Sequence, residues 1–300
     1  MTQAPANEKP EAWTIQRLLA WTADWLARAG SNTARVDAEL LLGHVLSKSR
    51  LHLLLNFDQP VQGDELAAYK QLIRRRARRE PVAYIIGRKG FHDIEVTVSP
   101  AVLVPRPETE TLVDFAAAYL QDTSAVAGPI LDLCTGSGCI ALALVRDMEK
   151  TGGAREVWAT DISAAALDVA RGNAVDQARP IFVAQGDLFQ ALPQGLRFAA
   201  LVSNPPYVTT ADLQTLEPDV RQFEPRLALD GGTDGLDVVR RIVAGAPDWL
   251  LPGGLIALEV GSRVQAVAVC SLCEAVGFVH VRPTQVVGSK TYVVTAVLGG

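Results

Sequence analysis

Two short segments of this 300-residue chain combine residue types that suggest a reactive site. The first, Asp132–Ala141, contains Gly136 and Gly138 and follows an apolar run that predicts a strand. Glycines between a strand and a helix let the backbone approach a ligand at the helix N-terminus. The spacing Gly136-x-Gly138-x-x-Ala141 is typical of dinucleotide sites, and an acidic residue, Asp161, ends the next expected strand. This segment therefore predicts a site for a nucleotide-type cofactor.

Asp132 restricts which cofactor that site would favour. A carboxylate at the end of the first strand would repel a pyrophosphate, whereas it would favour a ligand that carries ammonium and sulfonium groups. S-adenosylmethionine therefore fits better than a nicotinamide dinucleotide. Asp161 can accept hydrogen bonds from the ribose hydroxyls of either cofactor. Asp187 and Leu188 follow the expected strand Ile181–Gln185, where they could contact the adenine by a hydrogen bond and by apolar packing.

The second segment is Asn204-Pro205-Pro206-Tyr207, directly after the expected strand Phe198–Ser203. Two consecutive prolines fix φ and remove two N–H donors, which leaves a rigid turn that presents carbonyl oxygens. The side-chain oxygen of Asn204 and the Pro205 carbonyl can both accept from one planar NH2 group, and Tyr207 offers a flat face for packing. Since an amide nitrogen is a poor nucleophile, positioning would supply much of the catalysis. The turn predicts methyl transfer to an amide or an aromatic amine.

The pattern of apolar residues predicts the elements that hold these segments. Helical spacing over residues 14–80 predicts a small helical bundle. Val82–Ile86 and Phe91–Val98 alternate well enough to predict two strands, joined across Gly87–Gly90. From Pro129 onward strands and helices alternate, which predicts a parallel sheet covered by helices on both faces. One of these helices is expected to run over Asp234–Leu251.

Charge is distributed unevenly along the chain. The first 90 residues hold 14 basic and 9 acidic residues, a balance of +5, and the remainder holds 14 and 24, a balance of −10. Most of the basic excess comes from the run Arg74, Arg75, Arg76, Arg78 and Arg79. This run could bind nucleic acid or an acidic protein surface. We favour a solvated helix face, because no aromatic residues interleave the run as a stacking platform would require.

Composition excludes several classes of protein. The chain is 49% hydrophobic and 20% charged, without eighteen consecutive apolar residues, so we expect a folded protein with no membrane span. The first ten residues do not resemble a secretory signal, and four cysteines do not make a disulfide framework. Cys270 and Cys273 are expected to be small buried hydrophobes on one helix, with a redox pair as the alternative. The four histidines are scattered, so we expect no metal. Because we expect no membrane span, no secretory signal and no disulfide framework, we also expect a cytoplasmic location.

With these motifs in this order, the sequence resembles class I S-adenosylmethionine-dependent methyltransferases, and within them the peptide chain release factor glutamine methyltransferases. The resemblance covers roughly residues 14–280. Cys134 stands where many methyltransferases have a glycine. Beyond the two segments, the motifs that carry the resemblance are Pro81–Gly87, Pro105–Glu110, Phe223–Leu229, Gly231–Leu236 and Pro252–Gly254.

The resemblance implies a Rossmann-like sheet, S-adenosylmethionine as cofactor, and N5-methylation of the glutamine in the Gly-Gly-Gln loop of class I release factors. It implies a helical substrate-recognition domain (1–80), a β-hairpin linker (81–104) and a methyltransferase domain (105–300). Arg106 and Glu108 would be structural support near the pocket. The glutamine would be held by Asn204, Pro205, Pro206 and Tyr207. The cofactor would be bound by Asp132, Cys134, Thr135, Gly136, Ser137, Gly138, Asp161, Ile162, Asp187, Leu188 and Asn204.

Several alternatives remain at this level. A ribosomal-protein glutamine methyltransferase would share the Asn-Pro-Pro-Tyr turn, as would an adenine-N6 nucleic-acid methyltransferase. The latter would need a base-flipping pocket and usually a basic surface, whereas the second part of this chain is acidic. A nicotinamide oxidoreductase would leave Asp132 and the turn without a role, and a non-catalytic binding module would not need an intact turn. We expect a monomer whose partner is a release factor, with no direct contact to nucleic acid or membrane.

Overall fold

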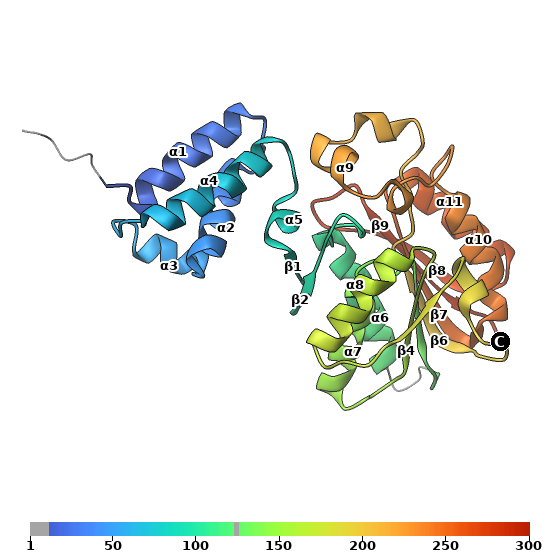
Figure 1. The fold of residues 1–300 in the computed structure, drawn as a ribbon. Helices are drawn as coiled ribbons and strands as arrows, with labels where there is room; N and C mark the ends of the chain where they lie inside the picture. Colours follow the sequence, from blue (N-terminus) through green and yellow to red (C-terminus); the bar gives the residue numbers. More distant parts are fainter. Residues whose placement is uncertain (1–11, 123–125) are drawn as a thin grey trace, which may run out of the picture. The chain divides into compact units, whose positions relative to one another are not determined.

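The computed structural model describes residues 12–122 and 126–300, which form two compact units, one as far as Ile86 and one from Gly87 (Figure 1). The segment used to judge a secretory signal lies outside the described residues. The first unit is helical, as expected, with a core that includes Ile15, Leu41 and Tyr69. Its helices are α1 (Ile15–Arg28), α2 (Ala34–Leu46), α3 (Arg50–Leu55), α4 (Gly63–Ala77) and α5 (Val82–Ile86).

The arginine run on α4 is not simply a solvated face, and this expectation was wrong in part. Arg76 is buried, and its Nε lies 2.7 Å from Asp37 Oδ2 on α2. Arg75 pairs with Glu80 at 2.5 Å. Arg79 donates to the carbonyl oxygen of Gly30. Arg76 therefore holds α4 to α2, because a buried guanidinium needs a fixed partner, whereas Arg75 and Arg79 make partly exposed contacts.

The predicted strand over Val82–Ile86 is wrong, because this segment is the helix α5. The carbonyl of Pro81 accepts hydrogen bonds from the N–H groups of Tyr84 and Ile85, which starts a helical turn. A short apolar run does not by itself distinguish a buried helix from a strand. The hairpin instead joins β1 (Arg88–Phe91) to β2 (Ile94–Thr97).

The second unit is built on a seven-stranded sheet in the order β5-β4-β3-β6-β7-β9-β8. Five strands pair in parallel with one another, and β9 runs antiparallel to both of its neighbours, β7 and β8. The Rossmann-like sheet is thereby confirmed. The strands are β3 (Ile130–Leu133), β4 (Val157–Asp161), β5 (Phe182–Gln185), β6 (Phe198–Ser203), β7 (Leu250–Val260), β8 (Phe278–Gln285) and β9 (Tyr292–Leu298).

Helices cover both faces of this sheet, as Figure 1 shows. On one face, α10 and α11 pack against side chains such as Leu131, Leu201 and Ile256. The predicted helix over Asp234–Leu251 ends early, at Gly245, because Pro247 cannot donate to a continuing helix and a strand begins at Leu250. The helices of this unit are α6 (Pro107–Gln121), α7 (Cys139–Thr151), α8 (Ala164–Asp176), α9 (Pro218–Phe223), α10 (Asp237–Gly245) and α11 (Arg263–Ala275).

The cysteines are free thiols. Cys273 on α11 lies in the hydrophobic core, and Cys270 packs beside it. Burial raises the pKa of Cys273 to about 12. A thiol with so high a pKa is a poor nucleophile, which agrees with the interpretation as a small hydrophobe. Within residues 12–122 and 126–300, no helix is long and apolar enough to cross a membrane.

Candidate active site

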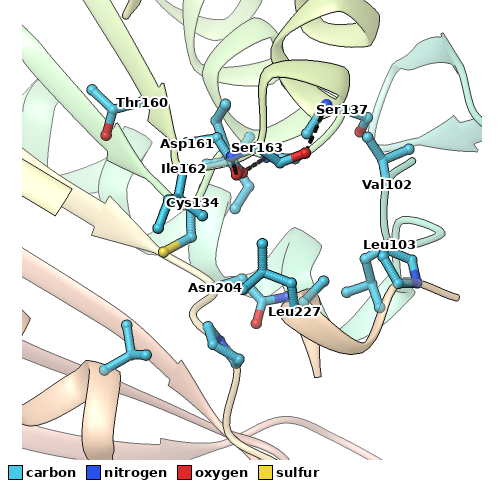
Figure 2. A pocket seen from close by; sticks show the side chains of 18 of the residues that line it. Val102, Leu103, Cys134, Ser137, Thr160, Asp161, Ile162, Ser163, Asn204 and Leu227 are labelled. Atoms are coloured by element: carbon cyan, nitrogen blue, oxygen red, sulfur yellow. Dashed lines mark hydrogen bonds between the residues drawn. The ribbon is translucent and has the colours of Figure 1, made fainter. Parts of the chain in front are cut away.

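A cavity of about 240 Å³ opens where the carboxyl ends of β3, β4 and β6 meet (Figure 2). In Figure 2, Asn204 and Leu227 lie on one side of the opening and Ser137, Asp161 and Ser163 on the other. Ten of the residues expected at the site line the cavity, and four do not: Asp132, Gly138, Pro205 and Tyr207. The ten are Cys134, Thr135, Gly136, Ser137, Asp161, Ile162, Asp187, Leu188, Asn204 and Pro206.

The loop after β3 depends on left-handed backbone conformations. Gly136 has a φ of 55° and Gly138 a φ of 78°, and Cys134 adopts a φ of 59° although it is not glycine. This explains why glycine suits the position of Cys134 in other methyltransferases. A Cβ on Gly138 would lie 3.2 Å from the Cβ of Ala170, whereas one on Gly136 would meet nothing within 4 Å. Gly138 therefore brings α7 close to α8, and Gly136 leaves the backbone open.

Asp161 joins this loop to the end of β4. Its Oδ2 accepts a hydrogen bond from the backbone N–H of Gly136 at 2.9 Å, and its Oδ1 accepts from Ser163 N–H at 2.9 Å. Burial raises the pKa of this carboxyl above its ordinary value, and the backbone N–H groups oppose that rise. Each carboxylate oxygen retains a lone pair for a hydroxyl donor from the cavity.

Asp132 lies behind the loop. Its Oδ2 accepts from the Thr135 hydroxyl at 2.6 Å and from Ala141 N–H at 3.2 Å, while Oδ1 is buried and has no hydrogen-bond partner among the described residues. Burial raises the pKa of this carboxyl to about 7. Asp132 is therefore placed to brace the loop and the start of α7, without a surface of its own in the cavity.

Asn173 on α8 braces the same loop, and sequence reasoning missed it. Its Nδ2 donates to the Ser137 carbonyl at 2.9 Å and to the Thr97 carbonyl at 3.0 Å. Its Oδ1 accepts from Thr97 N–H at 2.7 Å. One buried amide thus joins the hairpin, α8 and the glycine loop, and only the tertiary fold brings these segments together.

A cation that the sequence did not indicate stands next to Asp187. Arg241 on α10 lines the cavity, and its Nη2 lies 2.7 Å from Asp187 Oδ2. Leu188 follows in a left-handed conformation, with a φ of 53°. The ion pair fixes the orientation of the Asp187 carboxylate at the edge of the cavity.

The Asn204 side chain is oriented by a residue of α6. Its Nδ2 donates to the hydroxyl oxygen of Thr109 at 3.0 Å, and Thr109 is buried. With its amino group used in this way, Asn204 has its Oδ1 left as an acceptor. Thr109 lies within the Pro105–Glu110 block, but nothing in its residue type signalled this contact.

Pro206 and Tyr207 are held by a hydrogen bond from one glutamine and by close contacts with two glycines. Gln265 Nε2 donates to the Tyr207 carbonyl at 2.8 Å. A Cβ on Gly261 would lie 2.8 Å from the Tyr207 ring, and one on Gly231 would lie 2.6 Å from the Pro206 carbonyl oxygen. The Tyr207 ring is thus packed against the protein, so its expected free flat face does not line this cavity.

Arg106 lines the cavity as well, and Glu224 holds it. Arg106 Nη2 lies 2.6 Å from Glu224 Oε1, and Glu224 Oε2 accepts from Val104 N–H at 3.1 Å. Glu224 is buried, and this burial raises the pKa of its carboxyl.

Among the described residues, no group of three or more His, Cys, Asp or Glu is placed to hold a metal ion.

The sheet order β5-β4-β3-β6-β7-β9-β8, with its cavity at the carboxyl ends of β3, β4 and β6, belongs to a class I S-adenosylmethionine-dependent methyltransferase, as the matches to known proteins show. The fold agrees with that of a methyltransferase from Pyrococcus furiosus, at a TM-score of 0.53 and 19% identity, over 76% of this chain and 99% of that one. Family models for the PrmC N-terminal domain and the methyltransferase small domain match residues 17–87 and 109–222.

Curated relatives specify the family. A release factor glutamine methyltransferase from Geobacter sulfurreducens is 43% identical over 91% of this chain and 92% of its own length. Another from Burkholderia pseudomallei is 44% identical, over 87% of this chain and 90% of its own. The chain belongs to the release factor glutamine methyltransferase family.

Proposed function

We propose that this protein transfers a methyl group from S-adenosylmethionine to the side-chain amide nitrogen of a glutamine in a class I peptide chain release factor. The target is the glutamine of the Gly-Gly-Gln motif, as the family resemblance implies. The observation that carries the proposal is the placement of Asn204: Thr109 occupies its amino group, and its oxygen is left to accept from a planar NH2 group beside the cavity.

The cavity has the features that S-adenosylmethionine needs. Gly136 leaves the backbone open where a Cβ would project, and Asp161 offers carboxylate oxygens to ribose hydroxyls. Asp187 and Leu188 flank the cavity beyond Asp161, where they suit an adenine. When bound, the cofactor supplies an electrophilic methyl group: a nitrogen–carbon bond forms, the carbon–sulfur bond breaks, and the amide nitrogen loses a proton.

The turn contributes by holding the glutamine amide. Asn204 Oδ1 and the Pro205 carbonyl accept the two N–H groups, which directs the nitrogen lone pair toward the methyl donor. Because an amide nitrogen is weakly nucleophilic, its orientation toward the methyl donor would supply much of the catalysis. Orientation alone is worth up to about 7–11 kcal/mol in well-aligned intramolecular reactions. The contacts from Gln265, Gly231 and Gly261 keep the turn in one conformation.

We further propose that the helical unit recognises the release factor. The proposed domains are a recognition domain over 1–80, a linker over 81–104 and a methyltransferase domain over 105–300, whereas the compact helical unit extends to Ile86. Helix α3 leaves Leu51, Leu54 and Leu55 exposed by 55–71%, which suits an apolar contact with another protein. Changing Leu54 and Leu55 to Asp should raise the KM for the release factor and leave S-adenosylmethionine binding unchanged.

The decisive experiment measures transfer of labelled methyl from S-adenosylmethionine to purified unmethylated release factor. Label should appear on the wild-type factor and not on one whose motif glutamine is changed to Ala. Asn204→Ala should reduce transfer at least 100-fold. Asn32→Ala, at an exposed position in the helical unit away from α3, is the matched control and should keep full activity. Label on a ribosomal protein or a nucleic acid, with none on any release factor, would overturn the substrate assignment.

A further inference from the structure

The side-chain amide of Asn173 on α8 joins two segments that are far apart in sequence. Its Nδ2 donates to the Ser137 carbonyl at 2.9 Å and to the Thr97 carbonyl at 3.0 Å, and its Oδ1 accepts from the Thr97 N–H at 2.7 Å. Asn173 is 1% exposed. Because a side-chain amide has two N–H groups and both are used here, these three contacts fix a single orientation of the amide.

The Ser137 carbonyl receives its hydrogen bond from Asn173 in place of one from its own helix. In a regular helix an N–H donates to the carbonyl four residues earlier, so the Ala141 N–H would be the ordinary donor. Asp132 Oδ2 instead accepts from that N–H at 3.2 Å. Ser137 lines the cavity, and Gly138 and α7 follow it directly. The Asn173 amide therefore supports the wall of the cavity that would bind the cofactor.

The contacts with Thr97 tie the same amide to another wall. Thr97 is the last residue of β2. From there the chain continues into Val102 and Leu103, which line the cavity and border its opening in Figure 2. It then enters α6, where the Thr109 hydroxyl accepts from Asn204 Nδ2 at 3.0 Å. This second wall leads to the position proposed for the substrate glutamine.

We propose that Asn173 is a positioning residue that joins the cofactor wall of the cavity to the glutamine wall, so that S-adenosylmethionine and the release factor each strengthen binding of the other. The part that concerns the release factor rests on the proposed function. A cofactor that holds the loop at Ser137 also restrains the backbone at Thr97, because one rigid amide contacts both. The second ligand then loses less conformational freedom on binding, and by linkage the two effects are equal.

The link can be measured without any release factor. Asn173→Asp keeps the shape of the side chain and an acceptor for the Thr97 N–H, but it turns an oxygen toward the two carbonyls and so breaks the link. Hydrogen exchange of the Thr97 N–H, followed by NMR, should slow at least about fivefold when S-adenosylhomocysteine saturates the wild-type protein. Asn173→Asp should lose this response. A wild-type exchange rate that the ligand does not change would overturn the proposal, whether or not the variant folds.

Gln177→Glu is the matched control, because it makes the same change of amide to carboxylate directly after α8. The Gln177 side chain contacts the hairpin, since its Nε2 donates to the Glu95 carbonyl at 3.3 Å. Its Oε1 accepts from Arg179 Nη1 at 3.3 Å. This variant disturbs the hairpin from the same side without touching the hydrogen bond to Ser137, so it should keep the exchange response. Loss of the response in Gln177→Glu as well would refute a specific role for Asn173.

Binding of the release factor gives the second measurement. S-adenosylhomocysteine should lower the Kd of the wild-type protein for the release factor at least about fivefold, and in Asn173→Asp this factor should fall to within about twofold of one. The same variant should raise the Kd for S-adenosylhomocysteine about tenfold, because the Ser137 carbonyl loses its donor. Gln177→Glu should keep the wild-type values. A full wild-type factor in folded Asn173→Asp would refute the coupling.

Failure of the two proposals can be told apart. If the wild-type protein binds and methylates no release factor, the proposed function falls, while the exchange response of Thr97 still decides the role of Asn173.

Discussion

Gly261→Ala tests whether the Asn-Pro-Pro-Tyr turn must stay where the protein holds it. Gly261 follows β7, and an added Cβ would lie 2.8 Å from the Tyr207 ring, whereas ordinary contacts begin at 3.4 Å. The ring must therefore move by about 0.6 Å or more. It cannot do so without disturbing the 3.1 Å hydrogen bond from its hydroxyl to Glu259.

The expected size of the effect follows from this displacement. Overpacking of a tight site typically costs about 1–3 kcal/mol of the free energy of unfolding. For a unit of this size, each kcal/mol lowers the Tm by roughly 2–4 °C. Activity should suffer more than stability, because a displacement of about 1 Å at a reacting group can cost about 100-fold in rate.

The assay compares kcat, Tm and the Kd for S-adenosylmethionine in Gly261→Ala and in a control, Gly90→Ala. A Cβ on Gly90 would meet nothing within 4 Å, so this variant should match the wild-type protein or gain up to about 1 kcal/mol in stability. Gly261→Ala should lose kcat about 10- to 100-fold with little change in Kd. If it keeps kcat within twofold of wild type, a rigidly held turn is not what the reaction requires.

Three further variants test the supports of the site. Gly138→Ala combines a φ of 78° with a contact of 3.2 Å to Ala170, so urea unfolding should show a loss of about 1–3 kcal/mol and weaker cofactor binding; an unchanged midpoint would contradict the close approach. Asp132 has a folded-state pKa of about 7, above its ordinary 3.8, so the folded state keeps a proton that the unfolded chain releases. This pKa difference lowers the free energy of unfolding by roughly 4 kcal/mol as the pH rises from about 4 to about 7. Asp132→Asn should remove that part of the pH dependence, measured by unfolding at pH 5 and pH 8. An unchanged pH dependence would argue against a neutral buried acid. Arg106→Met leaves Glu224 buried without its partner and should cost about 3 kcal/mol in thermal unfolding, which a second change, Glu224→Gln, should largely recover; no recovery would mean that Arg106 acts by packing alone.

The parts of the fold that the sequence predicted well are those where one physical signal dominates. Ile130–Leu133 and Phe198–Ser203 have their expected bounds, because strands buried on both faces are short apolar runs followed by polar turns. Val82–Ile86 has the same kind of composition and yet is helical, since Pro81 starts a turn and the segment is too short for periodicity to decide.

The residues of the site also fall into those that the sequence predicts and those that it does not. Gly136, Asp161 and Asn204 were predictable, because each motif is contained within a single strand and its following loop. Thr109 was not, since 95 residues separate it from Asn204 and only the tertiary fold brings α6 beside the turn. Glu259 is the single acid within an otherwise apolar strand, which is typical of a buried acid that is paired, here with the Tyr207 hydroxyl.

The position of β9 in the sheet has a consequence for how the chain can be built and shortened. β9 pairs with β7 on one side and with β8 on the other, although it follows both in sequence. Until Tyr292–Leu298 has been synthesised, β8 has no strand to pair with, and β7, the strand that carries Glu259, presents an unpaired edge. A growing chain therefore exposes an aggregation-prone edge late in synthesis. Removal of this one strand would detach β8 and expose the edge of β7, so the end of the sheet that is made last tolerates truncation least.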